Sequence, residues 1–285
     1  MSQQNIHYFP GHMAKALNDI GPYVKSVDLV VEIADARAPL SSRNPVLNQL
    51  IGAKAHILVL SKSDFADPQV TSRWESYFAV QGLSVIASNL KKDQILALLK
   101  KASDPLVAAK RAKESKLGMK KQPLRVMVIG VPNVGKSTFI NSLAHRSIAI
   151  VGNKAGVTRS EQWIRLSEDF LLLDTPGVLP MNYLDGAQAV RLAILGSMKE
   201  EVLPTEDLAI ALLAYLKEAY PSSLNGRFGI SDISGLGTEE ILTKIAERRG
   251  LLEGGKPSGE KAAYLLIKEY KDGILGRYSL EDIHA

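Results

Sequence analysis

The loop at residues 130–137 restricts the possible fold more than any other segment of this 285-residue chain. It reads Gly-Val-Pro-Asn-Val-Gly-Lys-Ser and matches the pattern G-x-x-x-x-G-K-S. An apolar, strand-like run at residues 125–129 precedes the loop, and a helix-like stretch at residues 137–144 follows it. Backbone N–H groups converge on an anion in this strand–loop–helix context. The segment therefore predicts an α/β fold with a phosphate-binding loop.

Each residue of this loop has an expected role if the ligand is a nucleotide. Lys136 is expected to reach the outer phosphates and to assist catalysis there, and the hydroxyl of Ser137 is expected to bind Mg²⁺. The alternative is a Gly-containing strand-to-helix turn without a ligand, but the strand and the helix that the phosphate-loop pattern requires are both present and favour the phosphate loop. The expected phosphate contacts of the loop and the first helical turn are Asn133, Val134, Gly135, Lys136, Ser137 and Thr138.

A second apolar run, residues 170–173, ends in Asp174-Thr175-Pro176-Gly177. An Asp at the carboxyl end of a strand beside a phosphate loop can hold Mg²⁺, usually through water, and the amide of Gly177 would then contact the γ-phosphate. Thr158 lies between the two motifs. Its hydroxyl would join the metal only when the terminal phosphate is present, which would make its loop a nucleotide-sensing switch. Taken alone, residues 156–158 also fit an ordinary surface turn.

A possible base-binding motif follows the apolar run at residues 57–60 and reads Ser61-Lys62-Ser63-Asp64. The Lys62 stem can lie along a purine face, and the Asp64 carboxylate can accept two hydrogen bonds from the N1–H and N2–H₂ edge of guanine, which adenine lacks. Lys-x-Asp is common in surface turns, so this interpretation depends on the strand before it and on the phosphate loop. The motif favours GTP over ATP, and it comes about 70 residues before the phosphate loop.

This order of motifs resembles that of the circularly permuted GTPases of the YlqF/YawG family. The matching segments cover most of the chain: residues 8–15, 35–39, 41–45, 61–64, 130–137 and 174–177. The resemblance implies that the chain binds and hydrolyses GTP with Mg²⁺. Ser61 stands where the family usually has Asn, so a hydroxyl replaces an amide that would brace the base and the phosphate loop, and we expect weaker guanine affinity. Ser88 is the expected last nucleotide contact.

The hydrolytic step needs a polar group that the second motif does not supply. Many GTPases position the attacking water with a Gln after the Asp-x-x-Gly motif, but Val178 stands there. The resemblance points to His12, and we hypothesise that His12 orients or deprotonates the water once a partner orders the N-terminal segment. It also points to Asn133 as a ligand of K⁺, which would add positive charge in the transition state. A structural histidine and a loop-stabilising amide are the alternatives.

The arrangement of apolar runs predicts two domains. We expect residues 1–180 to form a P-loop GTPase fold with a mostly parallel six-stranded sheet, helices on both faces and a circularly permuted motif order. We expect residues 181–285 to form an all-helical domain, which a shift at Gly177 could reorient. The predicted strands are residues 28–34, 55–60, 83–87, 125–130, 162–166 and 170–174. The predicted C-terminal helices are residues 187–203, 207–219, 238–249 and 259–271.

The formal net charge of +5 is unevenly distributed. Residues 100–125 hold nine Lys or Arg against two acidic residues, which suits a phosphate backbone but also a solvated linker helix. Residues 185–285 hold 12 basic and 16 acidic residues, so an RNA contact there must be a local patch. The resemblance implies such a contact with ribosomal RNA. The candidate patches are Arg248 with Arg249 and Lys268 with Lys271.

We therefore expect a slow, monomeric GTPase that acts late in large ribosomal subunit assembly, with the ribosomal particle and its rRNA stimulating hydrolysis. The absence of cysteine, of a signal peptide and of an apolar run of about 18 residues favours a cytoplasmic protein without a membrane partner. Two other classes remain open from the residues. One is a nucleotide-gated RNA-binding or ribosome-binding scaffold with negligible turnover, and the other is a P-loop ATPase or nucleotide kinase.

Overall fold

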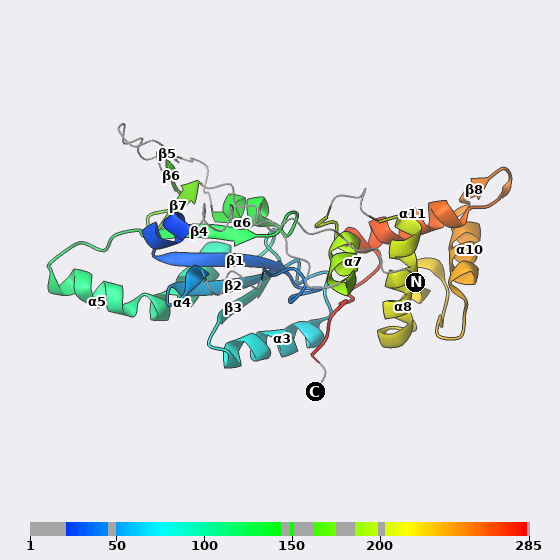
Figure 1. Ribbon diagram of the computed structural model, residues 1–285, viewed down its shortest axis with the longest axis horizontal. Helices are drawn as coiled ribbons and strands as arrows, with labels where there is room; N and C mark the ends of the chain where they lie inside the picture. Colours follow the sequence, from blue (N-terminus) through cyan, green and yellow to red (C-terminus); the bar gives the residue numbers. More distant parts are fainter. Residues whose placement is uncertain are drawn as a thin grey trace.

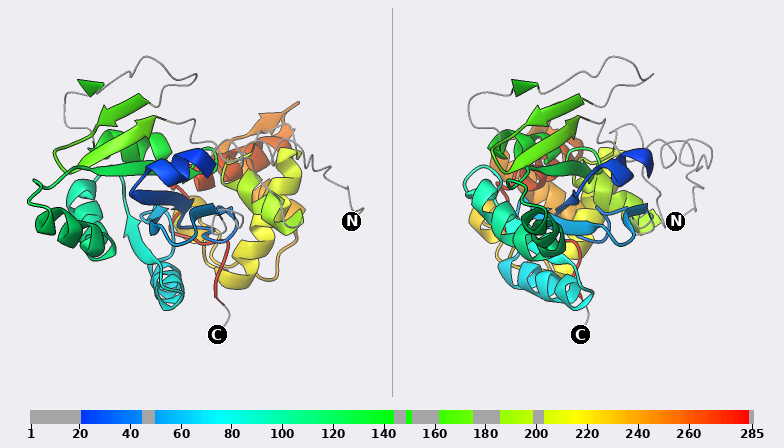
Figure 2. Two further views of the ribbon diagram at one scale, coloured as in Figure 1. Left: turned by 60° about the vertical axis from the view of Figure 1, so that its left-hand side comes forward. Right: turned by 90° about the vertical axis from the view of Figure 1, so that its left-hand side faces the viewer.

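The computed structural model describes residues 21–44, 50–143, 149–150, 162–174, 186–198 and 203–283. A sheet with its covering helices occupies one end of the long axis, and a group of helices occupies the other (Figure 1). Figure 2 shows the same two parts from two further directions. No helix among the described residues is both long and apolar enough to cross a bilayer.

The part of the sheet that the structure describes has seven strands in the order β3-β2-β1-β4-β7-β6-β5. The strands from β3 to β7 are parallel, whereas β6 and β5 pair antiparallel at one edge. The prediction of a mostly parallel sheet is confirmed, but the count of six was wrong, because β5 has only two residues and leaves no periodic pattern. The strands are β1 (Leu29–Asp35), β2 (Ala55–Ser61), β3 (Ser84–Ser88), β4 (Leu124–Gly130), β5 (Ala149–Ile150), β6 (Gln162–Arg165) and β7 (Phe170–Asp174).

Both faces of the sheet are covered, which explains why all seven residues of β1 are buried. Alternate residues of β1 and β2 pack against α4 (Ile95–Leu106) and α6 (Lys136–Leu143) on one face. Leu58 and Leu60 pack against α3 (Pro68–Val80) on the other face. Helix α3 begins after Asp67, whose side chain accepts hydrogen bonds from two backbone N–H groups of the first turn. The result is a three-layer α/β/α arrangement.

The strand register brings the motif residues to one edge of the sheet. Asp35, the last residue of β1, lies opposite Ser61 of β2, and Ser61 lies opposite Ser88 of β3. On the other side of β1, Ile33 lies opposite Gly130, the first residue of the phosphate loop. Because β1 separates β2 from β4, the base motif and the phosphate loop lie on either side of one central strand. Ligands bind at such carboxyl ends in open α/β sheets.

The second part of the molecule consists of helices around one apolar core. Helices α10 and α11 have the predicted bounds, but α7 ends at Ile194 rather than near residue 203, since Gly196 turns the chain with a φ of 73°. The short helix α9 was not predicted. The helices are α7 (Gly186–Ile194), α8 (Thr205–Ala219), α9 (Asn225–Phe228), α10 (Thr238–Arg249) and α11 (Gly259–Lys271).

The second part is not all-helical, which corrects the prediction. Strands β8 (Leu252–Glu253) and β9 (Lys256–Pro257) form a two-stranded hairpin between α10 and α11. Gly254 and Gly255 form its turn, and both have positive φ, which a tight two-residue turn requires. Four strand residues are too few for alternation to be visible in the sequence.

The segment after α11, residues 277–283, returns to the sheet-containing part and runs beside α3 (Figure 1). The amide of Leu280 donates to the carbonyl of Arg37 over 2.7 Å. The Trp74 indole N–H donates to the carbonyl of Glu281 over 3.2 Å. The carboxylate of Glu281 accepts hydrogen bonds from the backbone N–H groups of Leu40 and Ser41. The last described residues therefore belong to the sheet-containing part in space, although they follow the helices in sequence.

Candidate nucleotide-binding site

The phosphate loop has the backbone shape that its sequence predicts. Asn133 and Gly135 have φ angles of 59° and 105°, which turn the chain so that α6 begins at Lys136. Gly130 is needed at the start because a Cβ there would lie 2.5 Å from the carbonyl oxygen of Ile33. The loop therefore wraps closely over the end of β1 and directs the first amides of α6 toward one place, as an anion site requires.

Lys136 lies within this loop. Its Nζ donates to the carbonyl of Val131 over 2.6 Å, and burial lowers the pKa of Lys136. No carboxylate among the described residues pairs with this ammonium group. An anion at the loop would offset the cost of burying the charge. Ser137 is exposed and Thr138 half-buried in the first turn of α6, where both are open to a phosphate or a metal ion.

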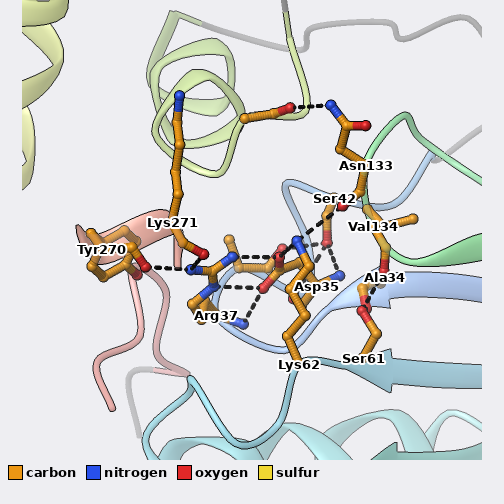
Figure 3. Close-up of polar contacts among 12 residues, drawn as sticks. Ala34, Asp35, Arg37, Ser42, Ser61, Lys62, Asn133, Val134, Tyr270 and Lys271 are labelled. Carbon is orange, nitrogen blue, oxygen red and sulfur yellow. Dashed lines mark hydrogen bonds and ion pairs between the residues drawn. The ribbon is translucent and has the colours of Figure 1, made fainter. Parts of the chain in front are cut away.

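Ser61 connects the base motif to the phosphate loop. Its fully buried Oγ lies 2.5 Å from the carbonyl oxygen of Val134 and 3.0 Å from that of Ala34. A hydroxyl has one proton, so it donates to one of these carbonyls at a time. Figure 3 shows this contact at the end of β2. The brace expected from the family's Asn is therefore present here with a shorter side chain, an outcome that the sequence did not indicate.

Lys62 also reaches the phosphate loop. Its Nζ lies 2.9 Å from the carbonyl oxygen of Asn133 and 2.9 Å from Oδ2 of Asp35 (Figure 3). Asp35 is fully buried and also pairs with Arg37. Burial alone would raise the pKa of Asp35, but the charges of Arg37 and Lys62 outweigh burial and hold this pKa well below its usual value. Asp35 and Arg37 lie in a segment that carries the family resemblance, but the sequence indicated no role for either side chain.

Asp64 is held from the neighbouring strand. The side-chain amide of Asn89 donates to Oδ2 of Asp64 over 2.8 Å. Ser88 is buried, and its hydroxyl donates a hydrogen bond to the carboxylate of Asp93. This carboxylate also accepts a hydrogen bond from the backbone N–H of Asn89. The predicted contact Ser88 thus supports the loop through its side chain, and Asn89 orients the predicted base reader. Asn89 directly follows the predicted contact Ser88, whereas nothing in the sequence pointed to Asp93.

Asn133, the predicted K⁺ ligand, contacts the helical part. Its side-chain Nδ2 donates to the carbonyl of Gly196, just after α7, over 2.6 Å (Figure 3). This contact leaves its Oδ1 as an acceptor. Three predicted site residues, His12, Thr158 and Gly177, lie outside the described residues. Asp174 ends β7 beside β4, where the prediction places it, but its side chain is not described.

The basic connector is partly neutralised. Lys100 and Lys121 pair with Asp169, and Lys110 of α5 (Ala108–Lys116) pairs with Asp28 beside β1. These ion pairs attach the connector to the sheet, which agrees with its interpretation as a linker helix. Within residues 100–125, the exposed lysines without an ion pair to a described residue are Lys101, Lys113, Lys116 and Lys120.

Comparison with known proteins agrees with this geometry. Ribosome biogenesis GTPase A of Bacillus pumilus (strain SAFR-032) is 37% identical over 277 residues, which cover 97% of this chain and 98% of that protein. The chain belongs to the ribosome biogenesis GTPase A family. The protein of that name from Thermotoga maritima is 34% identical over 97% of the chain and 94% of its own length. Mitochondrial ribosome-associated GTPase 1 of Mus musculus is 32% identical over 96% of this chain and 89% of its own length.

A family model described as 50S ribosome-binding GTPase matches residues 125–224. Two solved structures share the fold with a TM-score of 0.63. The GDP-bound structure of TM YlqF is 29% identical and covers 93% of this chain and 98% of that chain. The GNP-bound structure of YlqF from T. maritima is 30% identical, and the match covers 94% of this chain and 100% of that chain. The chain is therefore a GTPase with a guanine-nucleotide site on a circularly permuted P-loop fold.

Proposed function

We propose that this GTPase acts in the assembly of the large ribosomal subunit and that the ribosomal particle stimulates its hydrolysis of GTP. The supporting observation is the 37% identity over 97% of the chain to proteins named ribosome biogenesis GTPase A. The mitochondrial relatives are also named as ribosome-associated GTPases. The protein works as a monomer in the cytoplasm and binds the particle through its rRNA.

Mg²⁺ is the proposed metal of the site. Ser137, in the exposed first turn of α6, and Asp174, at the end of the adjacent strand β7, fit an Mg²⁺ ion at the carboxyl edge of the sheet. Thr158 is the proposed third ligand in the GTP state. The metal would neutralise charge on the β- and γ-phosphates, while Lys136 binds the outer phosphates and the amide of Gly177 binds the γ-phosphate.

His12 is the proposed positioning group for the attacking water, since Val178 cannot donate or accept a hydrogen bond. His12→Ala is expected to abolish the stimulation of turnover by large subunits while GDP affinity stays unchanged. Stimulated turnover at the wild-type rate in this variant would remove His12 from the mechanism.

K⁺ is the proposed second cation, bound in part by Oδ1 of Asn133. The support is geometric, because Nδ2 of Asn133 is already occupied by the carbonyl of Gly196 and the oxygen is therefore turned away from it. Turnover with subunits should be faster in K⁺ than in Na⁺ at equal ionic strength. Equal rates in the two salts would contradict the proposal.

The rRNA contact is proposed to use exposed lysines. Lys268 lies on the exposed face of α11, whereas the guanidinium of Arg249 lies over the ring of Phe228 and donates to the carbonyl of Arg227. Lys268 therefore fits a phosphate contact better than Arg249 does. Helix α5, which carries the connector lysines Lys113 and Lys116, lies at the opposite end of the molecule from α11 (Figure 1), so these lysines would offer a separate phosphate contact.

Co-sedimentation with purified large subunits tests the main proposal. Binding is expected with a GTP analogue and is expected to weaken with GDP, and phosphate release is expected to rise when subunits are added. Binding without faster phosphate release would favour a scaffold over a stimulated enzyme. No binding in either nucleotide state would refute the ribosomal partner and leave the guanine site intact.

A further inference from the structure

The loop that carries the base motif, residues 62–66, is held by the segment that follows α11. Arg277 bonds two carbonyls of this loop: its Nε donates to Ala66 over 3.0 Å and its Nη2 donates to Ser63 over 3.1 Å. The amide of Tyr278 donates to the carbonyl of Phe65 over 3.2 Å. Three carbonyls around Asp64, those of Ser63, Phe65 and Ala66, are thus bonded by residues that lie more than 200 positions later in the chain.

The packing at this contact leaves little freedom. A Cβ at Gly273 would overlap the ring of Phe65, so the chain just after α11 lies directly on the base loop. The hydroxyl of Tyr270 donates to the carbonyl of Tyr278 over 2.9 Å and ties the returning segment to α11 itself. A change in the position of α11 therefore moves the groups that bond the base loop.

A second connection runs beneath the loop. Lys62 pairs with Asp35, and Asp35 accepts Nε and Nη2 of Arg37 over 3.0 and 2.9 Å. Nη1 of Arg37 donates to the carbonyl of Tyr270 over 2.8 Å, at the end of α11 (Figure 3). The guanidinium is fully buried and also lies 5.6 and 5.2 Å from the ring centroids of Phe65 and Tyr270. Both ends of the base motif are therefore attached to the same helix terminus.

We infer that Arg277 is a positioning residue for guanine recognition, and that binding of the base is thermodynamically coupled to the attachment of α11 and residues 277–283. The guanidinium acts through the loop, because it bonds the carbonyls on both sides of Asp64. Lysine cannot replace it fully, since one ammonium group lacks the planar fork that bonds two acceptors at fixed separation. This inference rests on the guanine site alone and not on the ribosomal partner.

The coupling differs from any effect of the γ-phosphate. Because the base is common to GDP and GTP, both nucleotides should stabilise the contact equally, whereas a ligand of the phosphate loop alone should not. Coupling is also reciprocal, so whatever the segment adds to GDP affinity, GDP adds to the stability of the segment.

Calorimetry and hydrogen exchange test the inference in the full-length protein. Arg277→Ala is expected to lower GDP affinity at least about fivefold, the lower end of measured couplings, and Arg277→Lys is expected to fall between this variant and the wild type. In the wild type, GDP and a GTP analogue should slow exchange in residues 273–283 alike, and inorganic pyrophosphate should not. In Arg277→Ala this slowing should be lost at saturating GDP.

Arg73→Ala is the matched control. Arg73 is exposed and pairs with Asp282 of the same segment, but this pair does not touch the base loop. The Arg73→Ala variant should therefore keep a GDP affinity near the wild-type value. An equal loss in Arg73→Ala would overturn the role of Arg277, as would unchanged affinity and unchanged exchange in a folded Arg277→Ala. Failure of the wild type to bind GDP would instead overturn the guanine site itself.

Discussion

Replacement of Ser61 by Ala tests whether a hydroxyl does the bracing that the family assigns to an amide. The Oγ is fully buried and has two carbonyl acceptors, at Val134 and Ala34, but only one proton. Its removal therefore costs one buried hydrogen bond and leaves one acceptor unpaired, which amounts to about 1–3 kcal/mol. The loop keeps its second brace, the bond from Lys62 to the carbonyl of Asn133.

The free energy of unfolding of Ser61→Ala should thus fall by about 1–3 kcal/mol in urea denaturation. GDP affinity should fall by up to about tenfold, since 1.4 kcal/mol corresponds to a factor of ten. Ser103→Ala is the control, because Ser103 is also buried and its hydroxyl donates to the carbonyl of Lys100 within α4. It should lose stability but keep its GDP affinity. Unchanged stability and affinity in Ser61→Ala would refute the brace.

Three further predictions concern the base, the loop and the connector. Asp64→Asn should lower GDP affinity about 10–100-fold, because a charged acceptor is worth about 1.5–3 kcal/mol, and should favour xanthosine diphosphate in calorimetry. Gly130→Ala places a Cβ 2.5 Å from the carbonyl oxygen of Ile33 and should destabilise the protein by about 1–3 kcal/mol in urea. Burial alone would raise the pKa of Asp28, but hydrogen bonds from Lys110 and Arg125 lower it. Asp28 therefore stabilises the fold above its unfolded pKa, and this contribution disappears as the pH falls below about 4, so Asp28→Asn should show a shallower acid-induced loss of stability.

Each of these three predictions would be contradicted by a particular result. Equal affinities of Asp64→Asn for guanosine and xanthosine diphosphates, at the wild-type level, would remove Asp64 from base recognition. Gly226 has open space where a Cβ would lie and no positive φ, so Gly226→Ala should be nearly neutral. A loss of stability as large as that of Gly130→Ala would show that the contact with Ile33 is not the cause. An acid profile of Asp28→Asn parallel to the wild type would contradict the ion-pair argument.

The sheet and the main site could be predicted because their residues are of distinctive types. Apolar runs marked the strands, and Lys62, Asp64 and the phosphate loop follow strands whose carboxyl ends meet at one edge. Elements of two residues, such as β5, β8 and β9, were missed because alternation needs about four residues to be visible.

The supports of the site could not be predicted. Arg37 and Arg277 bond backbone carbonyls, which every residue carries, so nothing in the sequence distinguishes Tyr270 or Ser63 as a partner. The separation of 233 residues between Arg37 and Tyr270 also removes any local pattern. The Ser61 contact could not be predicted for a related reason, since the close approach of Val134 depends on how tightly the loop turns.

The clasp formed by residues 277–283 has a consequence for biosynthesis. A ribosome translating this chain makes the clasp after all seven strands of the large sheet and after the whole helical part. The phosphate loop can therefore emerge and fold early, while the guanine-reading loop gains its bonds from Arg277 and Tyr278 only after residues 277–283 have been made. A product that stops before residue 277 would keep the phosphate loop but lack these bonds, so its selectivity for guanine is expected to be weaker than that of a chain that contains the clasp.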